Sequence, residues 1–138
     1  MTSPTSLSRA ELAAKIAANL DTVQRTIAQC SPNASAVTVV AVTKTQPLEV
    51  VLAAYDAGLT HFAENYVDEL TGKVSAASVP DELTWQFIGA VQSRKIAVIA
   101  RHADVVASIS RQKEIERLAD CDVPLPRIMI QVDFTSAL

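Results

Sequence analysis

The chain has 138 residues, of which 49% are hydrophobic and 20% are charged, and its formal net charge is -3. This composition is typical of a globular domain and excludes an intrinsically disordered chain. The acidic balance argues against nucleic acid or an anionic membrane surface as a partner.

The sequence carries no targeting or metal-binding pattern. Its N-terminal residues lack the basic and apolar regions of a secretion signal, and no apolar run is long enough to span a bilayer. Cys30 and Cys121 form no C-x-x-C pair, and no histidine stands near either of them. We therefore expect a cytoplasmic protein with two reduced, buried thiols and no metal site.

A first helix is predicted over residues 8–30. Ser8 and Glu11 have the spacing of a capping box, in which each side chain bonds a free backbone N–H group of the other residue. Apolar residues then recur at helical spacing and form one stripe: Leu12, Ile16, Leu20, Val23 and Ile27. The segment Ser31–Asn33 ends this helix.

Strands and helices alternate in the rest of the chain. Strands are predicted over residues 37–43, 61–63, 85–88, 104–109 and 127–134, with helices beginning near Pro47, Asn65, Gln92 and Ser110. The first strand shows no polar alternation, which is typical of a parallel strand buried on both faces. The alternation predicts right-handed crossovers and an α/β fold with a parallel sheet.

The carboxyl ends of parallel strands meet at one edge, where such folds place their chemistry. Polar or small residues stand at these ends: Lys44, Glu64, Asn65, Gly89, Gln92, Ser108 and Asp133. Only three glycines occur in the chain, so the glycine-rich phosphate loops of Rossmann and P-loop proteins are absent. From position alone, Lys44 is either a reactive amine or a strand-end lysine that extends to solvent, as most such lysines do.

Four segments resemble one known family. AVTKTQP (residues 41–47), HFAENYVDEL (61–70), WQFIGAVQSRK (85–95) and IMIQVDF (128–134) are similar, in order and spacing, to motifs of the YggS-like pyridoxal 5′-phosphate (PLP) homeostasis proteins. The resemblance implies an alanine-racemase-like, TIM-barrel-like (β/α) array after the N-terminal helix. About five of the eight strands of such a barrel are present. The expected organisation is thus a single PLP-binding domain over 1–138, truncated on its C-terminal side, with open edges at the first and fifth strands.

The resemblance also implies the site. Lys44 would hold PLP as an imine (a Schiff base), and we expect it in a mostly apolar surround that favours the neutral amine. Asn65 would either bond the phenolic oxygen of the cofactor, cap a helix, or do both. Ile88 and Gly89 would line the pocket, because glycine lets the backbone approach a flat ring. The family's phosphate-binding loops, and the arginine that faces the pyridine nitrogen, belong to the part beyond Leu138.

Other polar residues are expected to be structural. We expect Glu64 in an ion pair, His61 as a hydrogen-bonded strand residue, His102 at a helix end, Trp85 in the core and Gln131 as an interior polar group rather than a pocket residue.

Three functional readings remain open. The first is a non-enzymatic PLP carrier in vitamin B6 homeostasis that delivers the cofactor to PLP-dependent apoenzymes. The second is a fragment of a PLP-dependent racemase or aldolase. The third is a truncated product that binds no cofactor and self-associates through its open sheet edges.

Overall fold

The computed structural model describes residues 7–135. Its elements follow the predicted alternation: α1 (Arg9–Cys30), η1 (Ala34–Ala36), β1 (Ala41–Val42), α2 (Leu48–Asp56), β2 (His61–Glu64), α3 (Val67–Val74), β3 (Thr84–Phe87), η2 (Ser93–Lys95), α4 (Ile96–His102), β4 (Val105–Ile109), α5 (Gln112–Ala119) and β5 (Arg127–Ile130). All four strand pairings are parallel, and the spatial order is β1-β2-β3-β4-β5. Each β-α unit therefore adds its strand beside the previous one, as in a barrel.

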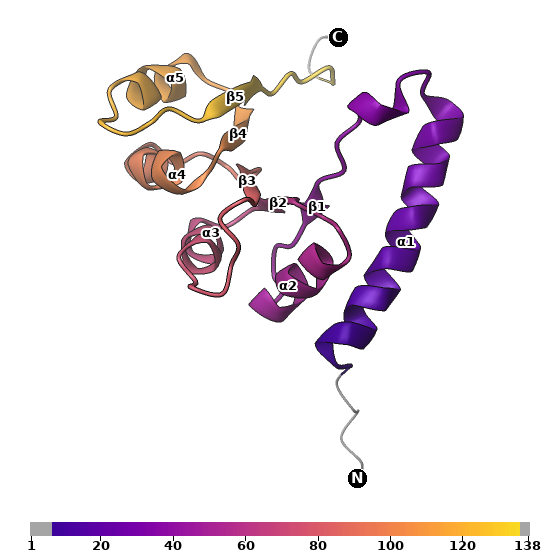
Figure 1. The fold of residues 1–138 in the computed structure, drawn as a ribbon. Coiled ribbons are helices and arrows are strands. Elements are labelled where there is room, and N and C mark those ends of the chain that lie inside the picture. The colour runs from indigo at the N-terminus through magenta and orange to yellow at the C-terminus, as the bar shows by residue number, and fades with distance from the viewer. Residues whose placement is uncertain (1–6, 136–138) are drawn as a thin grey trace.

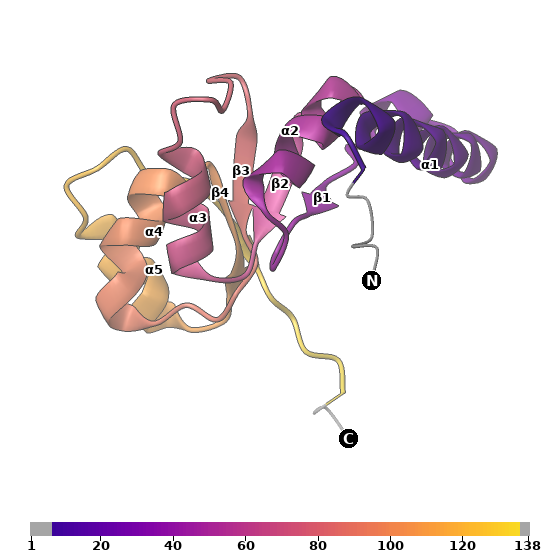
Figure 2. The same cartoon turned by 90° about the horizontal axis from the view of Figure 1, so that it is seen from below.

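Helices α2 to α5 lie on one face of the curved sheet, and α1 lies beside α2 (Figure 1). The view from below shows the same layers, with the segment after β5 running away from the helices (Figure 2). Strands β1 and β5 are the two outer strands of this sheet, so both predicted open edges are present.

The helix α1 begins as its sequence predicts. The Ser8 N–H donates to Glu11 Oε2 at 2.9 Å, and the Glu11 N–H donates to Ser8 Oγ at 3.3 Å, which completes the capping box. The helix is joined to α2 by Arg9, whose guanidinium makes a two-point ion pair with Asp56 at 2.6 and 2.7 Å. Ile16 and Leu20 of its apolar stripe pack against the core.

The core lies between the sheet and its helices. Phe62, Trp85 and Phe87 leave the strands on the helix side and are almost completely buried with Ile96 and Ile99 of α4. The rings of Phe62 and Trp85 are 5.6 Å apart in a tilted arrangement, so Trp85 is a core residue as predicted.

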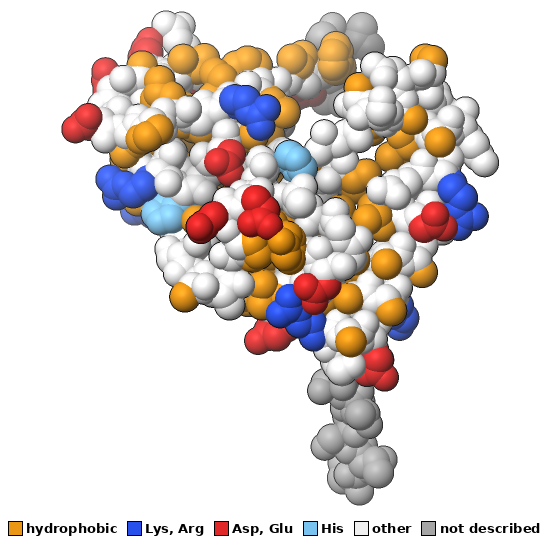
Figure 3. Space-filling model, in the orientation of Figure 1, with side chains coloured by type: hydrophobic (Ala, Val, Ile, Leu, Met, Phe, Trp, Pro, Cys, Tyr) orange, Lys and Arg blue, Asp and Glu red, His pale blue; other side chains and the backbone are white. Residues whose placement is uncertain are grey.

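The first and last strands differ from their predictions. Only Ala41–Val42 of the predicted 37–43 strand form β1, with one further ladder bond from the Thr43 N–H, and Val37 and Val42 are exposed, so the expectation of burial on both faces is wrong. The fifth strand ends at Ile130 instead of Phe134, and all of its residues are exposed. Both are edge strands with a sheet neighbour on one side only, which apolar composition alone does not reveal. Their hydrophobic residues reach the surface, where Figure 3 shows hydrophobic side chains between polar ones, and Ile128 of β5 lines a shallow hollow with Ile115 and Leu118 of α5.

Two predicted helix caps are also wrong. The N-cap of α3 is Tyr66 rather than Asn65, and that of α5 is Arg111 rather than Ser110. At α5 the buried Glu114 carboxylate takes the role of the cap, accepting the N–H groups of Ser110 and Arg111 at 2.9 and 3.1 Å. The cysteines are free thiols, but Cys30 is exposed and Cys121 is only partly buried, so their expected burial is wrong.

Candidate functional site

The candidate lysine lies in a tight turn at the carboxyl end of β1. The Thr43 N–H extends the ladder by donating to Ala63 O at 3.0 Å, and the chain then turns, with the Gln46 N–H donating to Thr43 O at 3.0 Å. Lys44 occupies this turn and is exposed, so the prediction that it is buried in an apolar surround is wrong. Among residues 7–135 no hydrogen bond or ion pair holds its amine.

The sheet register places the other candidates beside this turn. Ala41 and Val42 pair with Phe62 and Ala63, and Glu64 pairs with Phe87. Continuing this register brings Lys44 level with Asn65, and Asn65 level with Ile88. Successive side chains of a strand alternate between its faces, and Phe62, Glu64 and Phe87 are buried on the helix side. The register therefore assigns Asn65 and Ile88 to the opposite face of the sheet, whereas Lys44 lies in the turn after β1, where strand alternation no longer applies.

Gly89 is required by a close approach within the chain. A Cβ at this position would lie 1.9 Å from Asn65 O and 2.8 Å from Asn65 C, so no other residue fits without moving the backbone. The Gly89 carbonyl in turn accepts the Ser108 hydroxyl at 2.6 Å. The ends of β2, β3 and β4 are thus held together at the same edge, and the space left by the absent Gly89 side chain is taken up by the Asn65 backbone.

A buried ion pair lies directly beneath the lysine turn. Lys73 of α3 donates to Glu64 Oε1 at 2.7 Å, and the Thr43 hydroxyl donates to the same oxygen at 2.6 Å. Glu64 is fully buried, and its Oε2 has no hydrogen-bond partner among the described residues. The ion pair predicted for Glu64 is therefore present.

Burial raises the pKa of Glu64 above its ordinary value, and the hydrogen bonds from Lys73 and Thr43 only partly oppose this effect. Burial also acts on Glu69, but the Thr45 N–H and the Lys73 ammonium outweigh it and lower the pKa of this carboxyl. The two carboxylates beside Lys73 thus lie in different environments, and Glu69 is the more readily ionised.

Comparisons with known proteins agree with the resemblance drawn from the four segments. A pyridoxal phosphate homeostasis protein of Vibrio alginolyticus is 40% identical over 111 residues, which are 76% of this chain and 48% of that protein. The structure of PipY from Synechococcus elongatus with PLP bound aligns with a TM-score of 0.65 at 31% identity, over 76% of this chain and 47% of PipY. PipY without PLP gives a TM-score of 0.72 at 30% identity, over 86% and 54%. No model of a protein family matches the chain.

This chain is a homologue of the pyridoxal phosphate homeostasis proteins. It spans about half the length of the curated relatives it matches. The predicted fold class, a parallel (β/α) TIM-barrel-like array with five strands, is confirmed.

Sequence reasoning missed part of the site of this PLP-homeostasis homologue. It did not single out Lys73 or Glu69, although their i,i+4 spacing on one helix face was a usable signal. It also missed that Thr45 has a positive φ of 62°, which no residue pattern indicates.

Other polar residues lie apart from the lysine turn. His102 ends α4 as predicted, with Nδ1 2.9 Å from Val98 O. His61 lies at the start of β2, and its Nδ1 is buried without a partner among the described residues, so the expected hydrogen bond is wrong. Gln131 and Asp133 are exposed beyond β5, so the prediction that Gln131 is an interior group is also wrong.

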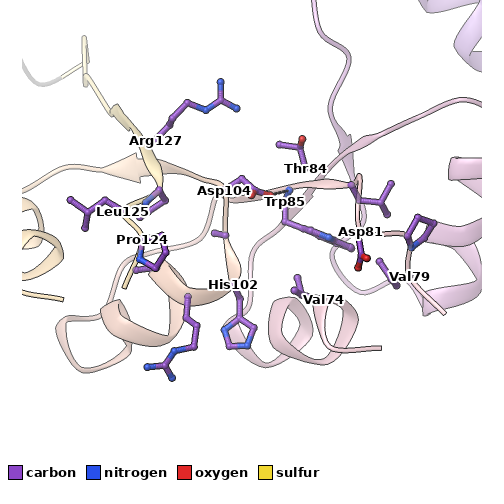
Figure 4. Close-up of a pocket in the computed structure, with 16 residues that line it drawn as sticks. Val74, Val79, Asp81, Thr84, Trp85, His102, Asp104, Pro124, Leu125 and Arg127 are labelled. Carbon is purple, nitrogen blue, oxygen red and sulfur yellow. Dashed lines mark hydrogen bonds between the residues drawn. The ribbon is translucent and has the colours of Figure 1, made fainter. Parts of the chain in front are cut away.

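A hollow of about 570 Å³ lies at the opposite end of the sheet. It is lined by residues at the starts of strands, among them Thr84, Trp85, Asp104 and Arg127 (Figure 4). Asp104 accepts the Trp85 N–H at 2.7 Å, and Arg127 points away from the other labelled residues. None of the four residues predicted to bind the cofactor lines this hollow: Lys44, Asn65, Ile88 and Gly89.

Residues 7–135 contain no group of three or more potential metal ligands. Within the same range, no helix is long and apolar enough to cross a membrane.

Proposed function

We propose that this chain carries the lysine-bearing part of a PLP-binding protein that acts in intracellular vitamin B6 homeostasis. The observation that supports it best is the arrangement at the β1 edge. Lys44 presents an amine without a hydrogen bond or ion pair among residues 7–135, on a turn that follows β1 at the end of the sheet where Asn65 follows β2 and Ile88 and Gly89 follow β3.

The residues present fit the chemistry of the cofactor. PLP supplies an aldehyde that condenses with a primary amine. Lys44 provides the amine: its nitrogen adds to the aldehyde carbon, a C=N bond forms, and the aldehyde oxygen leaves as water. Asn65 provides an amide that can donate a hydrogen bond to an anionic ring oxygen, and Ile88 provides a partly exposed apolar side chain for a flat ring, with the buried Gly89 packed against the Asn65 backbone behind it. Solved PipY with PLP bound supports the same ligand for this homologue.

The role that follows is storage and delivery rather than turnover. A reversible bond to Lys44 protects the aldehyde from other amines and allows its transfer to PLP-dependent apoenzymes. A racemase reaction needs a second base on the opposite face of the ring, and the ionisable groups beside the turn, Glu64, Glu69 and Lys73, are engaged with one another and with the turn backbone. We place this role in the cytoplasm, in a single domain over residues 1–138 that includes α1, with the open edges of β1 and β5 as its self-association surfaces.

The test is covalent trapping. The purified chain is titrated with PLP, reduced with borohydride, and mapped by peptide mass spectrometry, together with Lys44→Ala and the control Lys113→Ala, which changes an exposed lysine of α5. We expect a stoichiometric adduct on Lys44 that Lys44→Ala removes and Lys113→Ala retains, with unchanged helix content by circular dichroism. Labelling scattered over several lysines, or an unaltered adduct in Lys44→Ala, would overturn the assignment.

A further inference from the structure

The turn that carries Lys44 has a backbone conformation that needs support from outside. Thr45 has φ 62°, in the left-handed region, and it is the only residue other than glycine with a positive φ in the described structure. Threonine is β-branched, and this region is strongly disfavoured for such residues. Conformations of this kind persist only where surrounding contacts enforce them.

Helix α3 supplies that support on both sides of Lys44. On one side, Lys73 Nζ donates to Thr43 O at 2.8 Å. On the other, the Glu69 carboxylate accepts the Thr45 N–H at 2.7 Å. The residues before and after the lysine are therefore each bonded to α3.

Lys73 links these contacts into one network. Its ammonium has three N–H donors, and three acceptors surround it: Thr43 O, Glu64 Oε1 at 2.7 Å and Glu69 Oε2 at 3.3 Å. Lys73 is buried, and its donors are all engaged in this network beside the turn. Lys44 is the opposite case, because it is exposed and its amine makes no hydrogen bond or ion pair among residues 7–135.

Stability alone does not account for a buried charged network at this place. Removing two charges from water costs more than their attraction commonly returns, and apolar residues of the same volume stabilise such sites equally or better. What a bonded polar network adds is a single geometry, and here all three Lys73 donors have acceptors, although Glu64 Oε2 has no partner among the described residues. Here the groups whose geometry it determines are the Thr43 carbonyl and the Thr45 N–H, which lie on either side of Lys44.

We propose that Lys73 is a positioning residue, which acts with Glu64 and Glu69 to fix the backbone of the Lys44 turn and so to determine where the Lys44 amine is presented. The importance of that amine rests on the proposed function. The fixing of the turn does not, because the network and the strained Thr45 are contained in the chain itself.

The first test needs no cofactor. Amide hydrogen exchange at Thr45 and Gln46 is measured by NMR in the whole chain and in Glu69→Leu and Glu69→Gln. Both variants remove the charge, but only Gln keeps an oxygen that can accept the Thr45 N–H. We expect exchange at Thr45 to be about ten- to hundredfold faster in Glu69→Leu and near the original rate in Glu69→Gln. Equal exchange in all three proteins would overturn the proposal.

The second test uses PLP as the probe. The borohydride-trapped labelling rate of Lys44 is measured relative to that of the exposed Lys113, in Lys73→Met and in the control Lys95→Met, which changes a partly exposed lysine paired with Asp68 at 3.5 Å. We expect Lys73→Met to lower the relative rate at Lys44 about tenfold or more, since small displacements of a reacting group have effects of this size. Lys95→Met should leave it unchanged.

The two proposals fail in different ways. A chain that is not labelled at Lys44, but in which Glu69→Leu accelerates exchange at Thr45, contradicts the proposed function and supports the positioning role. A chain labelled at Lys44 at the same relative rate with and without Lys73, in a variant that keeps its circular dichroism, contradicts the positioning role. If Lys73→Met does not fold, the variants Glu69→Leu and Glu69→Gln still test the positioning role. Glu69 is partly exposed, so both substitutions should be tolerated by the fold.

Discussion

The three glycines of the chain offer a test of the structure by a single kind of substitution, glycine to alanine. At Gly89 the added Cβ would lie 1.9 Å from Asn65 O, whereas ordinary contact begins at 3.4 Å, so the backbones of these residues must separate by about 1.5 Å (3.4 less 1.9). Such a shift would break the bonds from the Ile88 N–H to Glu64 O (2.9 Å) and from Ser108 Oγ to Gly89 O (2.6 Å).

The cost of Gly89→Ala can be worked from these contacts. Overpacking strain of about 1 to 3 kcal/mol adds to the loss of two hydrogen bonds at about 1 kcal/mol each, so the free energy of unfolding should fall by about 3 kcal/mol or more. An unfolding entropy of about 2.1 cal/mol/K per residue gives about 0.3 kcal/mol/K for 138 residues. The expected loss in Tm is therefore about 10 °C.

The other two glycines serve as matched controls. Gly72 lies in α3 with nothing within 4 Å of an added Cβ, so Gly72→Ala should raise Tm by about 3 °C through helix propensity. Gly58 follows α2 with φ 95° and equally open space, so Gly58→Ala should cost only the backbone strain of about 1 to 2 kcal/mol. Thermal unfolding followed by circular dichroism checks all three. A Gly89→Ala variant within about 1 °C of the original chain, or above Gly58→Ala, would refute the reasoning about the strand ends.

Two further predictions concern buried carboxylates. Burial acts to raise the pKa of Glu114, but hydrogen bonds from the Ser110 N–H and from Arg111 outweigh it and hold the pKa below its ordinary value. A carboxyl with a lowered folded pKa stabilises the protein above its unfolded pKa and loses that contribution as the pH falls. Glu114→Gln should therefore lower the free energy of unfolding, measured with urea, by about 2 kcal/mol at pH 7. The loss should become smaller as the pH falls below about 4. An equal loss at both pH values would show that the charge of Glu114 is not the source of the stabilisation. For the buried pair, Lys73→Met should cost about 3 to 5 kcal/mol, because it leaves the buried Glu64 without its charged partner; Glu64→Leu should cost less, because Lys73 keeps the Glu69 carboxylate at 3.3 Å. The double variant should lose less stability than the sum of the two single losses, because neither charge of the pair then remains buried without the other; strictly additive losses in a double-mutant cycle would contradict the coupling.

The sequence by itself determined the order of the elements and the class of the fold. The capping box at Ser8, the spacing of apolar residues in α1 and the punctuation at Pro47 and Gly58 are local signals, and the structure contains the elements they predict. Strand-helix alternation was sufficient for a parallel sheet, because right-handed crossovers leave few other arrangements. The four segments also identified the homologous family.

The sequence could not show how exposed an element is. Residues 37–43 are as apolar as a central strand, yet β1 is an edge strand, and Lys44 is accordingly exposed rather than buried. Burial depends on which elements lie on both sides of a strand, and that is a property of the whole sheet.

Only the tertiary structure decided the contacts around the lysine turn. The partners of Lys73 include Thr43, 30 residues away, and Glu64, nine residues away, and Gly89 is required by the backbone of Asn65 on the neighbouring strand. No local pattern contains these distances. They exist because the sheet register places the ends of β1, β2 and β3 at one level, and because α3 crosses back beneath the turn that β1 forms. The residue types at the site were thus readable from the chain, but their roles follow from the elements that the fold brings together.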